Sequence, residues 1–181
     1  MIFLVPYAYD RMPGGKPRKG VPPNRLGSKA RCDALLAVIQ KNRLEHCHFV
    51  FTAGYSKESP KVPTKVGEIS MCWEMAIYIE SQEAGVGLGL WRISTAWGTY
   101  EETLHAINFI GLDSFIPPPD EVWVSTNLGH MPRVWLCWFF LKPKGWKVHF
   151  VVANHSFTLK EYFQETAKFL GYLYRFVFKK W

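Results

Sequence analysis

The stretch VWVSTNLGHMPRVW, residues 122–135, predicts a strand that ends in polar side chains and a helix that follows it directly. Its β-branched and aromatic start is typical of a strand, and Asn127 with Gly129 is typical of a turn. Pro132 fits the first turn of a helix, where its missing N–H has no helical partner to lose. In an open α/β sheet, ligands bind where strands end and helices begin. The expected binding site therefore includes five side chains of this stretch: Ser125, Thr126, Asn127, His130 and Arg133.

The rest of the chain alternates between strand-like and helix-like segments. Strands are predicted at residues 2–9, 48–53, 90–94, from 122 onward and at 147–152. Helices are predicted at residues 28–42, 69–83, 104–110, after the turn at 129 and at 158–178. This alternation predicts a three-layer, Rossmann-like α/β sandwich with a mostly parallel five-stranded sheet and helices on both faces. A chain of 181 residues, 48% of them hydrophobic, fits one domain over residues 1–181.

Three of these helices carry more detailed predictions. Ser28 is predicted as the N-cap of the first helix, and Thr99 with Glu102 has the form of a capping box before the third. The inner face of the first helix is expected to consist of apolar residues: Ala34, Leu35, Val38 and Ile39. In the last helix, apolar and aromatic residues recur at spacings of three and four, so most of them are expected in the core. Its tail, YRFVFKKW, favours core packing or a homodimer contact over a membrane surface.

Most of the net charge of +7 comes from one segment. Residues 10–31 contain seven Lys or Arg and a single Asp, and residues 10–27 are rich in Gly and Pro, which predicts a long loop. Because this loop follows the first strand, we expect it at the same sheet edge as His130. It is either a solvated loop or a basic lid that attracts an anionic substrate. Asp10, at the end of the first strand, is expected to face the same cleft.

Several classes of protein are disfavoured by the sequence. No apolar stretch is long enough to cross a membrane and the start lacks the features of a signal peptide, so a cytoplasmic location is expected. The four cysteines form no CxxC pair, and His46-Cys47-His48 precedes a strand that would point neighbours to opposite faces, so free thiols are favoured over a metal site. GxSxG and P-loop motifs are absent, and GVGLG at 85–89 follows a helix, so serine catalysis and dinucleotide binding are not expected.

Several short motifs occur in an order that resembles the YdcF/SanA/ElyC-type family of α/β proteins. The family pattern has Ser-Gly-Gly after a strand, Ser-Glu-Ala on a helix, Thr-x-Glu-Asn at a helix start, and Val-Thr-Ser-x-x-His-x-x-Arg after a late strand. The corresponding stretches are FTAGYS at 51–56, CWEMA at 72–76, TYEE at 99–102 and VSTNLGHMPR at 124–133. The His-x-x-Arg block is the most specific of them, and the order matches over nearly the whole chain.

The resemblance implies a ligand site that also includes Gly54, Glu74, Thr99 and Glu102. S-adenosylmethionine, which has been linked to cytoplasmic members of the family, is the cofactor or ligand that it implies. The Gly-rich turn that the pattern has after the first strand is replaced by PYAYD, and two further positions depart from the pattern: Tyr55 replaces a glycine, and Glu102 replaces an asparagine. Both changes suggest that the ligand or the chemistry differs here.

The residue types suggest individual roles. Arg133 can hold an anion bidentately beside the N–H groups of the helix start. His130 can donate a proton to a leaving oxygen or hydrogen-bond a phosphate, because imidazole titrates near neutral pH. Glu74 is expected as the complementary base or as a partner of a sugar hydroxyl, although a solvent-facing helix residue fits it equally. Ser125, Thr126 and Thr99 are expected as hydrogen-bond donors, with a helix cap as the alternative for Thr99.

Three functions fit these features. We favour an enzyme, or a protein derived from one, that acts on or binds a phosphorylated or nucleotide-like small molecule, with acid/base chemistry on a phosphate or glycosyl ester. A non-catalytic binder of a nucleotide or of S-adenosylmethionine is the second function. The third is a nucleic-acid-binding module that uses the basic loop with Tyr55, Trp97 and Tyr100, but nucleic acid is the least favoured partner because the charge lies in one segment.

Overall fold

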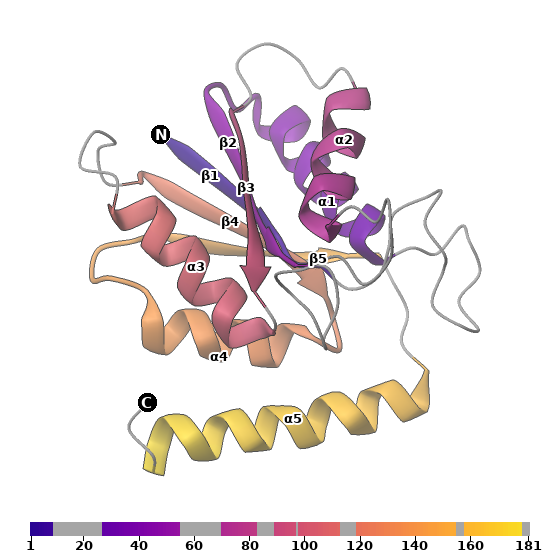
Figure 1. Ribbon diagram of the computed structural model, residues 1–181, viewed down its shortest axis with the longest axis vertical. Coiled ribbons are helices and arrows are strands. Elements are labelled where there is room, and N and C mark those ends of the chain that lie inside the picture. Colours follow the sequence, from indigo (N-terminus) through magenta and orange to yellow (C-terminus); the bar gives the residue numbers. More distant parts are fainter. Residues whose placement is uncertain are drawn as a thin grey trace.

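The sheet of this protein has five strands, all parallel (Figure 1). A computed structural model describes residues 1–8, 27–54, 70–82, 89–96, 98–112, 119–154 and 158–178. The strands are β1 (Ile2–Pro6), β2 (Cys47–Ala53), β3 (Gly89–Ala96), β4 (Glu121–Asn127) and β5 (Val148–Ala153). Their order across the sheet is β3-β2-β1-β4-β5, so the chain grows to one side of β1 and then crosses to the other. The predicted fold class is confirmed.

Five helices alternate with the strands: α1 (Gly27–Asn42), α2 (Met71–Ser81), α3 (Thr99–Leu112), α4 (Met131–Leu141) and α5 (Leu159–Phe178). Helices α1 and α2 cover one face of the sheet, and α3 and α4 cover the other (Figure 1). Helix α5 lies outside this sandwich and packs on α4. Within the described residues, no helix is both long and apolar enough to cross a bilayer.

The alternation of side chains along the strands explains why the sheet has two cores. In β1, Leu4 packs under α1 and α2, whereas Phe3 and Val5 pack under α3 and α4. All three are fully buried, as expected for a central parallel strand that is covered on both faces. On the α3/α4 side, Trp138 is also fully buried, and its indole N–H donates to the Tyr7 hydroxyl at 3.0 Å. This second core lies directly beneath the polar residues at the strand ends.

The buried face of α1 differs from the prediction. The helix begins at Gly27, so Ser28 is a buried residue of its first turn and not the N-cap. Its buried residues follow a regular helical stripe: Ser28, Arg31, Cys32, Leu35 and Leu36. The predicted Ala34 and Val38 are only partly buried. The prediction is confirmed for Leu35, which is fully buried, and Ile39 packs against the same core. It missed Ser28 and Arg31 because a search for apolar residues passes over a stripe whose first turn is polar.

The predicted capping box is also wrong. Helix α3 already includes Thr99, and the Glu102 N–H donates to the Gly98 carbonyl at 2.8 Å, so Gly98 occupies the cap position. The Thr99 hydroxyl instead lies 3.2 Å from His130, in the interior of the protein. The side chains of this motif therefore belong to the strand-end site and not to the helix cap.

The prediction that most of the stripe in the last helix belongs to the core is wrong as well. Several of its apolar residues are exposed: Leu159, Tyr162, Phe163, Leu170 and Val177. Phe169, Leu173 and Phe176 are partly buried, and Glu165 is the buried residue of the helix. The reason is that α3 and α4 already cover that face of the sheet, so α5 buries only a narrow strip of its surface. Tyr9, predicted in the first strand, lies outside the described residues.

Candidate functional site

The carboxyl ends of β1 and β4 lie side by side, at the point where the strand order reverses. The chain leaves β1 toward β2 on one side, whereas β4 pairs with β1 on the other. The Tyr7 N–H extends this pairing by donating to the Ser125 carbonyl at 3.2 Å. Such a reversal is the usual ligand position in an open α/β sheet. Six buried or nearly buried polar residues gather here, and we call them the switch-point cluster: Arg31, Glu102, Thr126, Asn127, His130 and Arg133.

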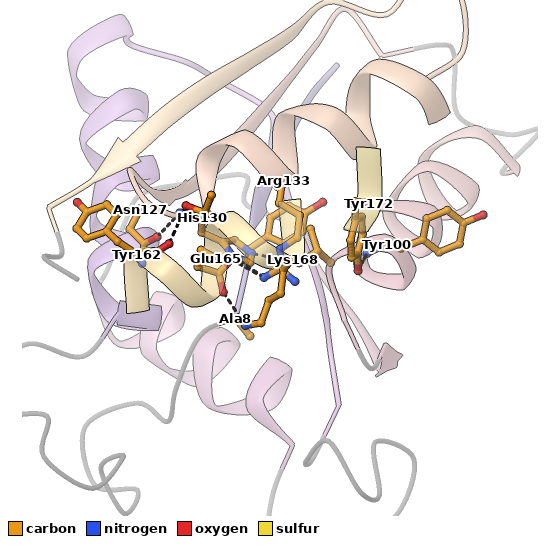
Figure 2. A network of polar contacts seen from close by, with 12 residues as sticks. Ala8, Tyr100, Asn127, His130, Arg133, Tyr162, Glu165, Lys168 and Tyr172 are labelled. Atoms are coloured by element: carbon orange, nitrogen blue, oxygen red, sulfur yellow. Dashed lines mark hydrogen bonds and ion pairs between the residues drawn. The ribbon is translucent and has the colours of Figure 1, made fainter. Parts of the chain in front are cut away.

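His130 lies at the centre of this cluster, immediately before α4. Its backbone N–H donates to the Asn127 side-chain oxygen at 3.1 Å, which fixes the turn between β4 and α4. Its Nε2 lies 3.2 Å from the Thr99 hydroxyl, and its Nδ1 lies 3.0 Å from the Glu165 carboxylate. A guanidinium nitrogen of Arg133 is 2.8 Å from the same Nδ1. Figure 2 shows the side chains of His130, Arg133 and Glu165 close to one another.

The ionisation of His130 and Glu165 follows from their surroundings. Burial, together with the charges of Arg133 and Arg31, lowers the pKa of His130 to about 3, although Glu165 opposes the shift. Burial alone would raise the pKa of Glu165, but the hydrogen bond with His130 and the charge of Arg133 lower it to about 2. At neutral pH the imidazole is therefore neutral and the carboxylate is charged.

A neutral imidazole has one N–H, so His130 has two hydrogen-bonding arrangements. With the proton on Nδ1, it donates to Glu165, and Nε2 accepts from the Thr99 hydroxyl. With the proton on Nε2, it donates to Thr99, and Nδ1 accepts from Arg133. In both cases Arg133 also pairs with Glu165 at 2.9 Å. The choice of tautomer is thus tied to the position of the Glu165 carboxylate.

Glu102 is the second carboxyl group of the site, and its environment differs. Burial raises its pKa to about 7, although the charges of Arg31 and Arg133 and a backbone hydrogen bond with Ala8 oppose the shift. A carboxyl group that titrates near neutral pH can both give and take a proton under physiological conditions. Glu102 is predicted at the ligand site, and it lies in the switch-point cluster.

The end of β4 provides both satisfied and unsatisfied polar groups. The Ser125 hydroxyl donates to the Arg31 carbonyl at 2.8 Å, so it links β4 to α1. Three atoms at the end of β4 and the start of α4 are buried and have no hydrogen-bond partner among the described residues: Thr126 Oγ1, Asn127 Nδ2 and Arg133 Nε. Buried polar groups are nearly always hydrogen-bonded, so these three atoms have unused hydrogen-bonding capacity.

Helix α5 lies over the switch-point cluster and adds two side chains, Glu165 and Lys168, that the sequence did not predict there. Its Lys168 pairs with Glu165 at 2.7 Å, and the Arg133 guanidinium lies over the Tyr172 ring at 5.5 Å from the centroid (Figure 2). A lone carboxylate within an aromatic helix face was the available signal for Glu165. Arg31 was also missed, and it donates to the carbonyls of Tyr7 and Ala8 at 2.8 and 2.9 Å. Its position three residues after Ser28, on the same face of α1, was the sequence feature that could have identified it.

Three of the predicted site residues stand apart from this cluster or cannot be placed. Glu74 is partly buried in the first turn of α2, on the other face of the sheet from α4, and the carboxylate that contacts His130 is Glu165. Its role as the complementary base stays a prediction. The backbone of Gly54 is already used, because its N–H donates to Ala96 and its carbonyl accepts from Met71. Asp10 and the basic loop at 10–27 lie outside the described residues.

The switch-point cluster combines two guanidinium groups, an imidazole and a carboxyl group with two neutral polar side chains. Within the described ranges, no three His, Cys, Asp or Glu side chains are grouped so that they could hold a metal ion. All four cysteines are buried free thiols, and burial raises the pKa of Cys137 to about 12, so it is protonated at neutral pH. In comparisons with known proteins, no family model, no curated protein and no solved structure matches this chain.

Proposed function

We propose that this protein binds a phosphorylated or nucleotide-like small molecule at the switch-point cluster and acts on it by acid/base chemistry. The observation that carries the proposal is the set of three buried polar atoms without partners among the described residues, on Thr126, Asn127 and Arg133. The amide and guanidinium nitrogens are donors and the hydroxyl can donate, so together they suit the oxygens of an anion. They lie beside the N-terminus of α4, where N–H groups and the helix dipole also favour negative charge.

The balance of charge in the cluster supports an anionic ligand. Arg31 and Arg133 are held in the interior, and one of the two nearby carboxyl groups, Glu102, retains its proton up to a pKa of about 7. The other, Glu165, accepts from Arg133 at 2.9 Å and from Lys168 at 2.7 Å. Charge-assisted bonds of this kind are equally available to phosphate oxygens. The contacts of this carboxylate are the kind that we propose for a bound anion.

Glu102 is the residue that we propose as the general acid. With a pKa of about 7, a sizeable fraction is protonated at neutral pH. In hydrolysis of a phosphate or glycosyl ester, water attacks the phosphorus or the anomeric carbon and gives one proton to the complementary base. The bond to the leaving oxygen breaks, and that oxygen takes the proton of Glu102. His130 is neutral and holds Arg133 and the ligand in place. Glu74 remains the proposed complementary base from the motif pattern.

A non-catalytic binder of a nucleotide or of S-adenosylmethionine is the competing proposal, and it rests on the resemblance to the YdcF/SanA/ElyC-type family. Both proposals place the ligand at the switch-point cluster, but only the enzyme proposal expects the ligand to be converted to a product. Incubation of the protein with a ligand that binds, followed by product analysis, separates them, and Glu102→Gln must abolish turnover while retaining the ligand if the enzyme proposal holds.

The test of the site itself is calorimetric titration with nucleotides, sugar phosphates and S-adenosylmethionine. Thr126→Val removes the unpartnered hydroxyl at nearly constant volume, so we expect unchanged or higher folding stability and an affinity about tenfold lower for the bound ligand. Thr103→Val is the matched control, because the Thr103 hydroxyl is buried but bonds to the Thr99 carbonyl and to Tyr7. It is expected to lower stability and leave the affinity unchanged.

Two outcomes contradict the proposal. If no phosphate-bearing ligand or S-adenosylmethionine binds, the cluster is structural. If a ligand binds with equal affinity to Thr126→Val and to the wild type, it lies elsewhere. Binding of nucleic acid with an affinity that falls steeply with salt would instead favour the basic loop as the functional segment.

A further inference from the structure

The Arg133 guanidinium has one edge that is only partly used. Its Nε and Nη2 form this edge, and their parallel N–H bonds suit two oxygens of a carboxylate or a phosphate. Nε is buried and has no hydrogen-bond partner among the described residues. Nη2 carries two N–H bonds, and it contacts His130 Nδ1 at 2.8 Å and the Glu165 carboxylate at 2.9 Å. An anion that uses the whole edge therefore has to replace one of these two contacts.

Glu165 is the contact that electrostatics would have the anion replace. An anion on this edge of Arg133 would lie close to the Glu165 carboxylate, whose low pKa keeps it charged at neutral pH and whose side chain is only 8% exposed. Like charges at short range inside a protein repel strongly, because little water screens them. The His130 imidazole, whose pKa is about 3, is neutral and does not repel an anion in this way. The ligand therefore competes with Glu165 and not with His130.

The contacts of His130 favour the same replacement. Its Nδ1 lies within hydrogen-bond distance of both a donor, Arg133, and an acceptor, Glu165. One nitrogen of a neutral imidazole either donates or accepts, so it satisfies only one of these two partners at a time. Without Glu165, Nδ1 accepts from Arg133, and Nε2 donates to the Thr99 hydroxyl 3.2 Å away. Removal of the carboxylate thus leaves His130 with two compatible hydrogen bonds.

Helix α5 is attached in a way that allows this carboxylate to leave. Glu165 is the buried residue of the helix, and its aromatic contacts are only partly buried, such as Phe176, which stacks on Phe140 of α4 with the ring centroids 4.9 Å apart. Elements with few buried contacts open at a low cost in free energy. Lys168 pairs with Glu165 at 2.7 Å from the same helix, so the carboxylate leaves together with a cation. The middle of α5 can therefore move away while β4 and α4 stay in place.

We propose that Glu165 is an autoinhibitory carboxylate, which occupies one anion position beside the switch-point cluster until a bound phosphate group displaces it together with the middle of α5. This inference rests on the proposed function, because it concerns the same anion site. The phosphate takes Nε and Nη2 of Arg133, and Glu165 turns to solvent with Lys168. The apparent affinity is then the intrinsic affinity multiplied by the fraction of molecules in which Glu165 has left. Helix α5 thereby regulates access to the site.

The first experiment is calorimetric titration of the full chain with inorganic phosphate at pH 7. Glu165→Gln keeps the shape of the side chain and removes its charge, so it should bind phosphate at least about tenfold more tightly than the wild type. Glu80→Gln, which makes the same change in net charge at an exposed position of α2, is the matched control and should bind like the wild type. Glu165→Gln/Thr126→Val should lose about tenfold relative to Glu165→Gln, because it removes a donor of the same anion site.

A second experiment follows the displacement in the wild type, because Glu165→Gln is itself expected to be less stable. Hydrogen–deuterium exchange is measured by mass spectrometry with and without saturating phosphate. Residues 162–172 of α5 should exchange faster when phosphate is bound, whereas residues 122–134 should exchange no faster. In Glu165→Gln the same part of α5 should exchange rapidly without phosphate, and phosphate should add little.

The outcomes distinguish failure of this inference from failure of the proposed function. If the wild type binds phosphate and Glu165→Gln binds it no more tightly, the inference is wrong and the proposed function stands. Slower or unchanged exchange of α5 in the phosphate-bound wild type overturns the inference as well, because the helix then stays over the ligand. If neither protein binds inorganic phosphate or any of the phosphorylated ligands titrated above, the proposed function is wrong and the inference fails with it. Phosphate binding by Glu165→Gln alone supports both.

Discussion

Glu102 and Glu165 enter the same site from two regions of the molecule, α3 on the sheet and α5 outside it, and their pKa values move in opposite directions. Each is only 7% exposed, yet the pKa of Glu102 rises to about 7 and that of Glu165 falls to about 2. The two pKa values differ because the two carboxyl groups have different direct partners. Glu165 contacts His130, Arg133 and Lys168, whereas Glu102 has the more remote charges of Arg31 and Arg133 and one backbone hydrogen bond. Burial alone therefore does not decide the charge of a carboxyl group.

The same two regions differ in packing. The residues beneath the switch-point cluster belong to the core between the sheet and α3 and α4, where Trp138 is fully buried. Helix α5 lies beyond that core and exposes most of its apolar side chains. The residues beneath the switch-point cluster, such as Trp138, are therefore part of the folding core. Helix α5, on the other side of the cluster, is held mainly by the polar contacts of Glu165 and a narrow apolar strip.

The largest effect is expected from truncation beneath the switch-point cluster. Trp138→Ala should lower the free energy of unfolding by about 3–5 kcal/mol, because it leaves a cavity and removes the hydrogen bond to Tyr7. Phe163→Ser on the outer face of α5 should change it by less than about 0.5 kcal/mol. Urea unfolding of both variants measures the difference. Equal losses would show that α5 belongs to the cooperative core.

The next effect concerns Glu165. Its folded pKa of about 2 lies below the ordinary 4.5, so its contribution to stability is present above pH 4.5 and disappears as the pH falls toward 2. The contribution is on the order of 3 kcal/mol. Glu165→Gln should therefore be less stable than the wild type at pH 6, and the two should converge in acid. The exposed Glu80→Gln is the control, and a constant difference for Glu165→Gln across this range would contradict the pairing.

Glu102 should show the opposite dependence, of similar or smaller size. Its folded pKa of about 7 lies above 4.5, so the unfolded chain loses the proton first and stability falls as the pH rises from 4.5 to 7. Glu102→Gln removes this cost, on the order of 3 kcal/mol at most. The variant should gain stability relative to the wild type between pH 5 and 8 in urea titrations. Parallel pH profiles of the two proteins would show that Glu102 is ionised throughout.

The smallest effect is expected from Lys168. Its ammonium pairs with Glu165 at 2.7 Å, but its side chain is 43% exposed, so solvent screens the interaction. Lys168→Met should lower stability by less than about 1 kcal/mol. The matching substitution Arg133→Met, measured in the same assay, should cost more, because it leaves the Glu165 carboxylate without the cation partner that is itself largely buried. A loss for Lys168→Met as large as that for Arg133→Met would mean that α5 is held by the lysine.

Much of the fold was predictable because it follows from local patterns. The β-branched run at Val122, the turn at Asn127 and Pro132 in the first turn of α4 each restrict the backbone on their own. The edge where His130 and Arg133 meet was predictable for the same reason, since parallel strands all end at one edge. The inner face of α1 was not, because its stripe begins with Ser28 and Arg31, which no apolar pattern reveals.

The sequence by itself determined the alternation of strands and helices and the cluster of polar side chains where β4 ends. The tertiary structure decided which carboxylate meets His130, since Glu165 is 35 residues away along the chain and on a different helix. It also decided that α5 turns an apolar face outward. The physical reason is the same in both cases: helical periodicity specifies which side chains share a face, but only packing specifies what that face contacts.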